Sequence, residues 1–262
     1  MTALLKVENL TVIFSGGRKR GEVKALDGLS FSVEKGESLS IIGESGSGKT
    51  TLMRSILGHL EPSEGNVFLF GKNMYRASRG ERIALRRRCG MISQDPYGSL
   101  PPTLTVLEAV MEPWLLVKGR GERQEGERRA RSLLEEIGIY GEDLLSSRVR
   151  LSLSGGQRQR VAIARGLILQ PELLLCDEPT SMQDASTRGE ILAVLQRRQE
   201  EGMSMIFVTH DLFLARKAAR RGIVLHRGVL VEEGLCSDLL TAPKHSYTKA
   251  LVAALPRLTP TN

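Results

Sequence analysis

The feature that most constrains this chain of 262 residues is the glycine-rich loop Gly43-Glu44-Ser45-Gly46-Ser47-Gly48-Lys49-Thr50. A short, mostly apolar run over 38–42 precedes it and a helical pattern over 49–57 follows, so we expect a strand, a turn and a helix in that order. Glycines let backbone N–H groups curl around an anion without Cβ clashes, and the positive end of the helix dipole faces the same point. The loop therefore predicts a phosphate-binding site.

The loop also fits the full pattern G-x-x-x-x-G-K-[ST], in which the lysine reaches the β- and γ-phosphates of a nucleotide and the hydroxyl ligates Mg²⁺. Lys49 and Thr50 occupy those two positions. An ordinary strand-to-helix turn rich in glycine and serine is the alternative, and the complete pattern in this context favours nucleotide binding. The candidate nucleotide-binding residues of the loop are Gly43, Glu44, Ser45, Gly46, Ser47, Gly48, Lys49, Thr50 and Thr51.

A second motif is Leu153-Ser154-Gly155-Gly156-Gln157. Ser154 and Gln157 have the spacing of a helix capping box, and the apolar residues over 161–168 predict a helix behind it. The two glycines cost helix stability and leave bare amides, which suits a helix end that approaches a phosphate closely. Local physics leaves open whether this segment binds phosphate or only caps a helix. The further candidate nucleotide-binding residues are Ser154, Gly155, Gly156 and Gln157.

A third motif is a carboxylate pair, Asp177-Glu178, at the end of the apolar run 172–176. An apolar run without alternation is typical of a strand that is buried on both faces of a parallel sheet. Two carboxylates there are costly to bury unless a cation lies beside them, and Mg²⁺ bound to ATP would supply that cation. Asp177 is then the candidate Mg²⁺ ligand, and Glu178 is placed to orient or deprotonate the attacking water. A solvated acidic pair at a strand end is the alternative.

Together these motifs resemble the nucleotide-binding subunits of ATP-binding cassette (ABC) transporters, and LSGGQ favours that family over other P-loop ATPases. The resemblance implies that Gln94 senses Mg²⁺ and the γ-phosphate, with Thr50 and Asp177 as the other metal-side residues. It implies that His210, in Val208-Thr209-His210-Asp211, is the switch histidine and acts with Glu178 and Gln94 in catalysis. It also places Phe14 near the aromatic residue that stacks on adenine. A structural histidine and a core phenylalanine are the alternatives for His210 and Phe14.

The implied fold is an α/β P-loop NTPase of the ABC ATPase type, with a RecA-like parallel-sheet core and an N-terminal antiparallel β subdomain. A helical subdomain over about 94–153 is expected as an insertion, within an ATPase domain over 1–238. The residue patterns add β-like runs over 4–33 broken by a loop at 15–21, and a strand at 66–70. They also predict helices over 105–114 and 125–137, a strand at 203–208 and a hairpin over 224–231.

A closer resemblance, to the peptide/nickel importer branch, covers nearly the whole chain. It is carried by the segments 94–100 and 105–108 and by a C-terminal tail motif over 240–251, within the tail 239–262. The resemblance implies an ATPase that energises the import of peptides, nickel or metal–chelator complexes. One segment departs from the family: Ser181-Met182-Gln183-Asp184 stands where Ser-Ala-Leu-Asp is usual, and Gln183 leaves the dimer-interface contact of this loop open.

The family arrangement also implies partners. Two ATPase subunits meet head to tail, so that LSGGQ of one chain caps the γ-phosphate bound by the other, in a homodimer or a heterodimer. Integral membrane permeases hold the pair, and an extracytoplasmic substrate-binding protein acts indirectly. Two other hypotheses are a soluble ABC ATPase that acts on nucleic acid or ribosomes, and a regulatory module with an inactive site. Intact Lys49, Asp177, Glu178 and His210 disfavour the inactive module.

The net charge of +7 at pH 7 invites a nucleic-acid hypothesis, but acidic residues intersperse most of the basic clusters. Only 4% of the residues are aromatic, which leaves few platforms for base stacking, so we expect no specific nucleic-acid partner. No apolar run approaches the ~18 residues of a membrane span. We therefore expect a peripheral protein at the cytoplasmic face of the inner membrane, recruited through a partner.

Overall fold

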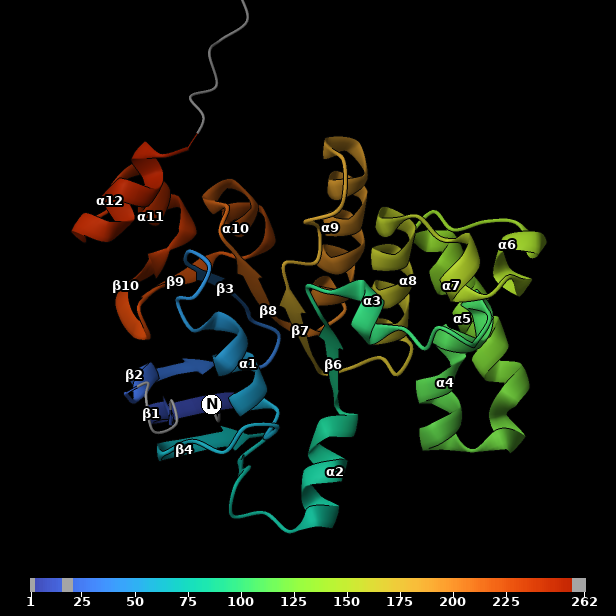
Figure 1. The fold of residues 1–262 in the computed structure, drawn as a ribbon, viewed down its shortest axis with the longest axis horizontal. Helices are drawn as coiled ribbons and strands as arrows, with labels where there is room; N and C mark the ends of the chain where they lie inside the picture. Colours follow the sequence, from blue (N-terminus) through green and yellow to red (C-terminus); the bar gives the residue numbers. More distant parts are fainter. Residues whose placement is uncertain (1–2, 16–20, 256–262) are drawn as a thin grey trace, which may run out of the picture.

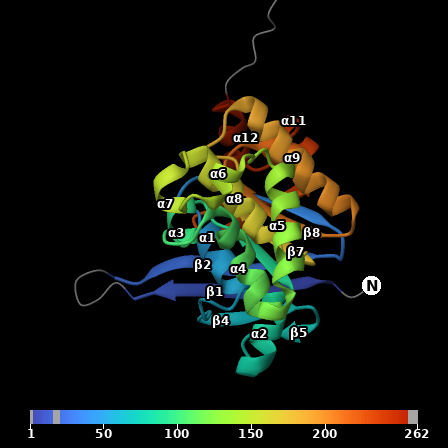
Figure 2. The same ribbon diagram turned by 90° about the vertical axis from the view of Figure 1, so that its right-hand side faces the viewer.

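The structure is a computed structural model that describes residues 3–15 and 21–255, and its strands form two sheets (Figure 1). The smaller, antiparallel sheet has the strand order β2-β1-β4-β5. Its strands are β1 (Leu5–Phe14), β2 (Val23–Val33), β4 (Glu64–Leu69) and β5 (Lys72–Asn73). Figure 2 shows β1 and β2 running across the molecule behind the helical region.

The larger sheet has the strand order β10-β9-β3-β8-β7-β6, and every neighbouring pair is parallel except β9 and β10. Its strands are β3 (Ser38–Ile42), β6 (Cys89–Ile92), β7 (Leu173–Asp177), β8 (Ser204–Thr209), β9 (Arg221–His226) and β10 (Val229–Leu235). The central strands β3, β7 and β8 are buried along their whole length. This burial explains why most of their residues are apolar, because helices or another sheet cover both faces.

Alternate side chains of the central strands enter two different hydrophobic cores. In β7, Leu174 and Cys176 join the core that the long helices cover, whereas Leu173 and Leu175 join the core under the antiparallel sheet. The antiparallel sheet and α1 (Lys49–Ile56) therefore cover one face of the large sheet, and α8 (Gly155–Leu167) and α9 (Ala185–Glu200) cover the other.

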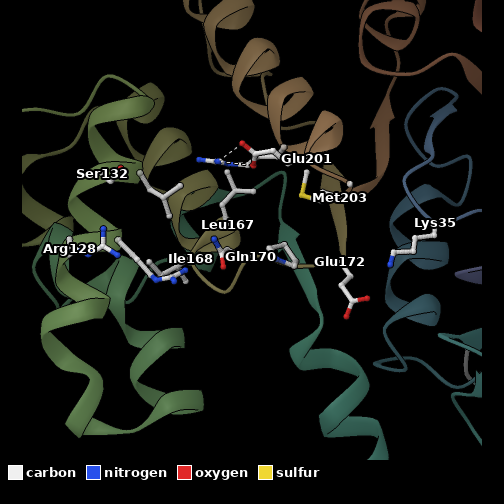
Figure 3. Close-up of a pocket in the computed structure, with 14 residues that line it drawn as sticks. Lys35, Arg128, Ser132, Leu167, Ile168, Gln170, Glu172, Glu201 and Met203 are labelled. Atoms are coloured by element: carbon white, nitrogen blue, oxygen red, sulfur yellow. Dashed lines mark hydrogen bonds and ion pairs between the residues drawn. The ribbon is translucent and has the colours of Figure 1, made fainter.

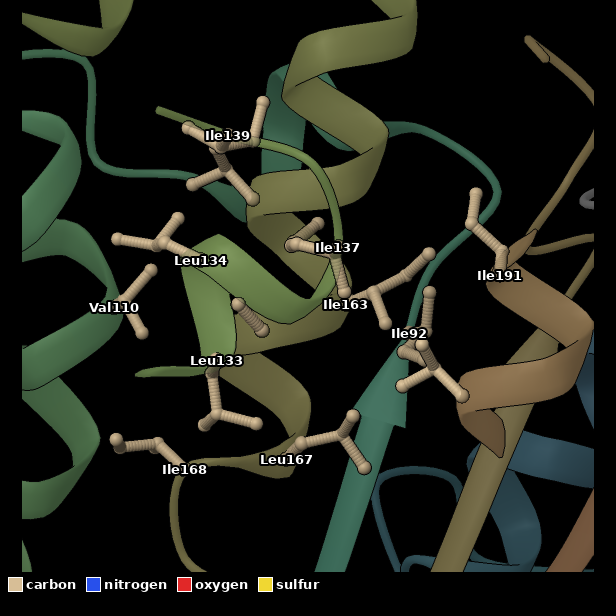
Figure 4. Close-up of a cluster of buried hydrophobic side chains, with 14 of the residues drawn as sticks. Ile92, Val110, Leu133, Leu134, Ile137, Ile139, Ile163, Leu167, Ile168 and Ile191 are labelled. Carbon is tan, nitrogen blue, oxygen red and sulfur yellow. The ribbon is translucent and has the colours of Figure 1, made fainter. Parts of the chain in front are cut away.

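The helical region does not have a core of its own. Val110 in α4 (Val106–Lys118) and Leu134 in α5 (Arg123–Glu136) belong to the same buried cluster as Ile92 of β6 and Ile163 of α8. Figure 4 shows these side chains converging from α4, α5, α8 and β6. A change in the packing of α4 or α5 can therefore reach the large sheet through α8.

A third, smaller cluster holds the C-terminal elements against the β9 side of the large sheet. Leu212 and Ala215 of α10 (Leu212–Ala218) pack there with Cys236 and Leu239 of α11. The tail forms α11 (Cys236–Thr241) and α12 (Ser246–Ala253), which lie beside β10 in Figure 1. The tail helices thus lie at the opposite end of the large sheet from α4 and α5.

The structure confirms the predicted fold class and the main predicted segments. The strand predicted at 38–42 is β3, the helices predicted at 105–114 and 125–137 lie in α4 and α5, and the hairpin predicted over 224–231 is β9–β10. Most of the loop predicted at 15–21 lies outside the described residues. Among residues 3–15 and 21–255, we find no helix with the length and apolarity that a bilayer crossing demands.

Several elements were not predicted from the sequence. They include α2 (Arg79–Arg87), β6, and the short helices α3 (Pro96–Ser99), η1 (Arg120–Glu122), α6 (Glu142–Ser146) and α7 (Val149–Ser152). The first of them begins with a capping box between Ser78 and Glu81. That spacing is visible in the sequence and is the signal that would have located α2.

Candidate nucleotide-binding site

A cleft of about 490 Å³ lies beyond the carboxyl ends of β3, β7 and β8. Residues from all three strand ends reach it because parallel strands end at the same edge of a sheet. Its lining residues are Ala25, Glu44, Ser45, Gly46, Gly48, Lys49, Thr50, Thr51, Gln94, Asp177, Glu178 and His210. The structure therefore brings together most of the site residues predicted from the phosphate loop, the carboxylate pair, Gln94 and His210.

The phosphate loop needs glycine for two separate reasons. Gly46 and Gly48 have φ angles of +81° and +106°, in the left-handed region that other residues rarely adopt. A Cβ atom on Gly43 would lie 2.4 Å from the carbonyl oxygen of Leu225, so strand β9 approaches the loop too closely for a side chain. The loop is therefore fixed both by its own backbone and by the strand beside it.

Lys49 is the cation of the cleft and is only 7% exposed. Its Nζ donates hydrogen bonds to the carbonyl oxygens of Gly43 at 2.7 Å and Glu44 at 2.6 Å. Burial lowers the pKa of Lys49, while the carboxylates of Glu178, Asp177 and Glu44 oppose that shift. An ammonium group held in this way is already partly stripped of water and is ready to bind an anion.

Asp177 also lines the cleft and is 4% exposed. Its Oδ2 accepts a hydrogen bond from the Thr50 hydroxyl at 3.0 Å. Burial raises the pKa of Asp177, although the bond from Thr50 counteracts it. The protein by itself therefore compensates the negative charge of Asp177 only in part.

This donor set fits Mg²⁺. The Thr50 hydroxyl, the Asp177 carboxylate and the Gln94 amide offer hard oxygen ligands at one cleft. Within 3–15 and 21–255, no cluster of three or more histidine, cysteine, aspartate or glutamate side chains could hold a metal by itself. Mg²⁺ bound with a nucleotide takes most of its ligands from phosphates and water, so a few oxygen ligands from the protein suffice.

Glu178 and His210 form a pair at the mouth of the cleft. Nδ1 of His210 lies 3.0 Å from Oε1 of Glu178. The backbone of Glu178 has a φ of 47°, a left-handed conformation that is strained for a residue with a side chain. The Glu178 N–H donates to the Val208 carbonyl at 3.0 Å, so the end of β8 holds this residue in place. These two residues meet because β7 and β8 are neighbours in the sheet.

The LSGGQ segment forms the start of α8 and does not line this cleft. Its capping box is present: Ser154 Oγ accepts from the Gln157 N–H at 3.2 Å, and Gln157 Oε1 accepts from the Ser154 N–H at 2.9 Å. The structure thus confirms the predicted cap but does not bring Ser154, Gly155, Gly156 or Gln157 to the nucleotide residues of the same chain.

The atypical residue Gln183 points into its own chain. Its side chain is 7% exposed, and its Nε2 donates to the Gly156 carbonyl at 2.8 Å. Arg188 in turn donates to the Gln183 carbonyl at 3.1 Å. The loop after β7 is therefore attached to the first turn of α8 by a buried amide.

Besides the LSGGQ residues, three predicted residues do not line the cleft. Gly43 and Ser47 belong to the phosphate loop, but both are buried and neither lines the cleft. Phe14 ends β1 and is 43% exposed, with its strand partner Val23 two residues before Ala25 of the cleft. Sequence reasoning missed Ala25, which no local signal in the sequence indicates.

The larger cleft of the described residues lies elsewhere. It has a volume of about 880 Å³ and is lined by residues that precede β3, β7 and β8, such as Lys35, Glu172 and Met203 (Figure 3). It thus lies at the opposite end of these strands from the phosphate loop. Ion pairs such as Arg198 with Glu201 and Arg88 with Glu172 neutralise its charged side chains. Size alone therefore does not identify the functional site.

Comparison with known proteins gives a consistent set of relatives. A family model described as ABC transporter matches residues 26–181. The putative oligopeptide transport ATP-binding protein YkfD of Bacillus subtilis is 38% identical over 254 residues, which are 97% of this chain and 76% of the relative. The dipeptide transport ATP-binding protein DppF of Haemophilus influenzae is 37% identical over 243 residues, 92% of this chain and 73% of the relative.

Solved structures resemble the fold closely. The ATP-binding cassette MJ0796, a dimer in a post-hydrolysis state bound to ADP and Pi, has a TM-score of 0.80 and 33% identity, covering 88% of this chain and 98% of that chain. The cassette cbiO1 from Clostridium perfringens, part of the ABC transporter complex cbiONQ, has a TM-score of 0.77 and 30% identity, covering 98% of this chain and 97% of that chain.

Proposed function

Since the chain belongs to the ABC transporter family, we propose that it is the ATP-hydrolysing subunit of an importer for peptides, nickel or metal–chelator complexes. The observation that carries this proposal is the cleft in which Lys49, the Thr50–Asp177 contact and the Glu178–His210 pair meet. The relatives named as oligopeptide and dipeptide transport proteins favour peptides as the cargo. The tail over 239–262 is the segment we assign to that branch.

ATP is the substrate that this cleft suits. The phosphate loop and Lys49 bind its phosphates, with Thr51 in the first turn of α1 beside them. Thr50, Asp177 and Gln94 hold Mg²⁺, which neutralises phosphate charge when it is bound. Phe14 remains our candidate for the adenine contact.

Hydrolysis depends on Glu178. Its carboxylate orients the attacking water or takes its proton, and His210 holds that carboxylate in place through the contact at 3.0 Å. The strained backbone at Glu178 supports this role, because such strain concentrates at functional sites. Gln94 follows β6 and begins the helical region over about 94–153, so it is placed to pass the state of the nucleotide to that region.

A second ATPase subunit completes the site. The LSGGQ residues lie outside the cleft of their own chain, so a partner's LSGGQ must supply the contact to the γ-phosphate. The dimeric structure of MJ0796 is consistent with such an arrangement. We propose that the pair is a homodimer or a heterodimer, bound to integral membrane permeases at the cytoplasmic face of the inner membrane. An extracytoplasmic substrate-binding protein delivers the cargo.

The proposal is tested by purifying the tagged chain from native membranes and identifying the subunits that co-purify. We expect integral permease subunits and a second ABC ATPase subunit. The competing hypothesis, a soluble ABC ATPase that acts on nucleic acid, predicts instead strong stimulation of ATP hydrolysis by RNA or DNA, with a steep salt dependence. That result, without any permease in the purified complex, would overturn the transport assignment.

A further inference from the structure

The C-terminal tail reaches the phosphate loop through Tyr247. Glu232 of β10 accepts the N–H groups of Lys244 at 2.8 Å and His245 at 3.0 Å, which fixes the chain just before α12. His245 then caps α12, because its Nδ1 accepts from the Tyr247 N–H at 3.2 Å. Tyr247 is therefore held in the first turn of a short helix that β10 anchors.

The hydroxyl of Tyr247 accepts a hydrogen bond from the backbone N–H of Glu44 at 3.2 Å. That N–H belongs to the same peptide unit as the Gly43 carbonyl, which accepts from Lys49 Nζ at 2.7 Å. Because a peptide unit is planar, a bond at its N–H and a bond at its C=O together fix the orientation of the whole unit. The tail and the lysine thus hold one peptide plane from its two sides.

We propose that Tyr247 is a positioning residue for Lys49: its hydroxyl sets the Gly43–Glu44 peptide, and that peptide in turn sets the lysine that binds the phosphates. The inference rests on the proposed function, because it assigns Lys49 to nucleotide binding. It makes the tail a part of the nucleotide site, and the tail otherwise only packs on the surface of the molecule.

The ring and the hydroxyl of Tyr247 have separate contacts. The ring packs against His226, with ring centroids 3.8 Å apart. His226 ends β9, and the following turn also touches the phosphate loop, because the Gly228 N–H donates to the Ser47 carbonyl at 3.0 Å. A phenylalanine at 247 would keep the ring contact and lose the contacts of the hydroxyl with Glu44. The role of the hydroxyl can therefore be tested without removing the packing of α12.

The test compares Tyr247→Phe with wild type and with the matched control Tyr140→Phe. Tyr140 is exposed and lies outside the nucleotide cleft. We expect Tyr247→Phe to weaken binding of a nonhydrolysable ATP analogue with Mg²⁺ by about three- to tenfold, the range for loss of one ordinary hydrogen bond. The KM for ATP should rise by a similar factor, while kcat at saturating ATP and the melting temperature change little. Tyr140→Phe should leave all four quantities unchanged.

The outcomes separate this inference from the proposed function. If wild type fails to bind the analogue, the nucleotide assignment is wrong. If wild type binds and Tyr247→Phe binds within twofold of it, Tyr247 does not position Lys49. A lower melting temperature with unchanged affinity would show that Tyr247 only stabilises the tail and would likewise overturn the inference.

Discussion

At the residue scale, two buried groups of opposite charge, Lys49 and Asp177, line the nucleotide cleft. Burial lowers the pKa of Lys49 and raises the pKa of Asp177, so both are held in a setting that disfavours their charged forms. The protein compensates them only in part, through carbonyl oxygens for Lys49 and one hydroxyl for Asp177. Bound phosphate would balance the charge of Lys49, and bound Mg²⁺ would balance the charge of Asp177. Ligand binding should therefore raise the stability of the folded protein.

Replacing Lys49 tests the phosphate contact. Lys49→Ala removes a charged donor, and such hydrogen bonds contribute about 1.5–3 kcal/mol, so we expect roughly 10- to 100-fold weaker ATP binding and loss of turnover. Titration calorimetry measures the affinity, and circular dichroism checks that the fold is intact. The matched control is Lys35→Ala, which removes a lysine at the other end of β3. Near-normal ATP affinity in Lys49→Ala would contradict the assignment.

Asp177 provides a prediction about stability and pH. Its folded-state pKa is raised above 3.8, so the ionised form costs free energy in the folded protein at neutral pH. Asp177→Asn should therefore stabilise the nucleotide-free protein at pH 7 by about 1 kcal/mol, or roughly 2–4 °C. The gain should shrink as the pH falls through the folded-state pKa, and vanish below 3.8, where both side chains are neutral. Thermal unfolding over a pH series measures it.

The same substitution should weaken nucleotide binding that depends on Mg²⁺, because the neutral amide is a poorer ligand for a hard cation. Nucleotide titrations with and without Mg²⁺ separate the two effects. A variant that is less stable than wild type at pH 7 would refute the idea that the carboxylate is underneutralised.

At the element scale, the start of α8 is attached to the loop after β7 by Gln183. The buried amide donates to the Gly156 carbonyl in the first turn of the helix, where a leucine is usual in the resembling family. This bond ties the LSGGQ segment to the loop that follows Asp177 and Glu178. The sequence showed the departure, and the structure shows that the side chain turns toward its own chain.

Placing a negative charge at position 183 tests the hydrogen bond between Gln183 and Gly156. Gln183→Glu places a buried carboxylate against a carbonyl oxygen, so we expect a loss of about 2 kcal/mol of stability, or roughly 4–8 °C in melting temperature. The matched control Gln183→Met has a similar volume and loses only the hydrogen bond, at a cost of about 1 kcal/mol. Calorimetric unfolding compares the three proteins. Equal melting temperatures for Gln183→Glu and wild type would show that the amide is not buried as described.

At the scale of the whole molecule, the LSGGQ segment lies apart from the nucleotide cleft of its own chain. The cleft lies at the edge where β3, β7 and β8 end, and α8 begins beside the loop after β7 without reaching the cleft. In the proposed arrangement, a second subunit placed head to tail would bring each LSGGQ segment to the other chain's cleft. ATP would then contribute to holding the two subunits together.

The dimer prediction uses a substitution of Glu178, the proposed catalytic carboxylate, to hold the ATP-bound dimer closed. Glu178→Gln should keep ATP affinity and lose most hydrolysis, by about 10²- to 10⁴-fold, because the amide cannot accept a proton. The closed dimer should then accumulate with two ATP, as size-exclusion chromatography with ATP and Mg²⁺ would show. Ser154→Arg in the same background should release the monomers, since a bulky cation at the start of α8 blocks its approach to the partner.

Two results would count against this scheme. If Glu178→Gln hydrolyses ATP at the wild-type rate, Glu178 is not the catalytic carboxylate. If the ATP-bound dimer still accumulates when Ser154→Arg is added, the subunits do not meet head to tail. If the competent partner is a related subunit, the trap should form only when both chains are mixed.

Local signals in the sequence determined the parts of the site that depend on neighbouring residues. The left-handed turns of the phosphate loop follow from Gly46 and Gly48, and the cap of α8 follows from Ser154 and Gln157, because both depend on interactions within a few residues. The strands β3, β7 and β8 followed from their short, mostly apolar runs. β6 escaped prediction because it has only four residues, and its pairing with β7 is what defines it.

Only the tertiary structure decided which distant residues meet. Thr50 and Asp177 are 127 residues apart, and Glu44 and Tyr247 are 203 apart, yet each pair is joined by a hydrogen bond. Such contacts depend on the order of parallel strands and on the packing of α12, which no local pattern encodes. The same holds for the inward turn of Gln183 and for the separation of LSGGQ from the cleft of its own chain. Sequence thus determined the chemistry of each motif, and packing determined their geometry.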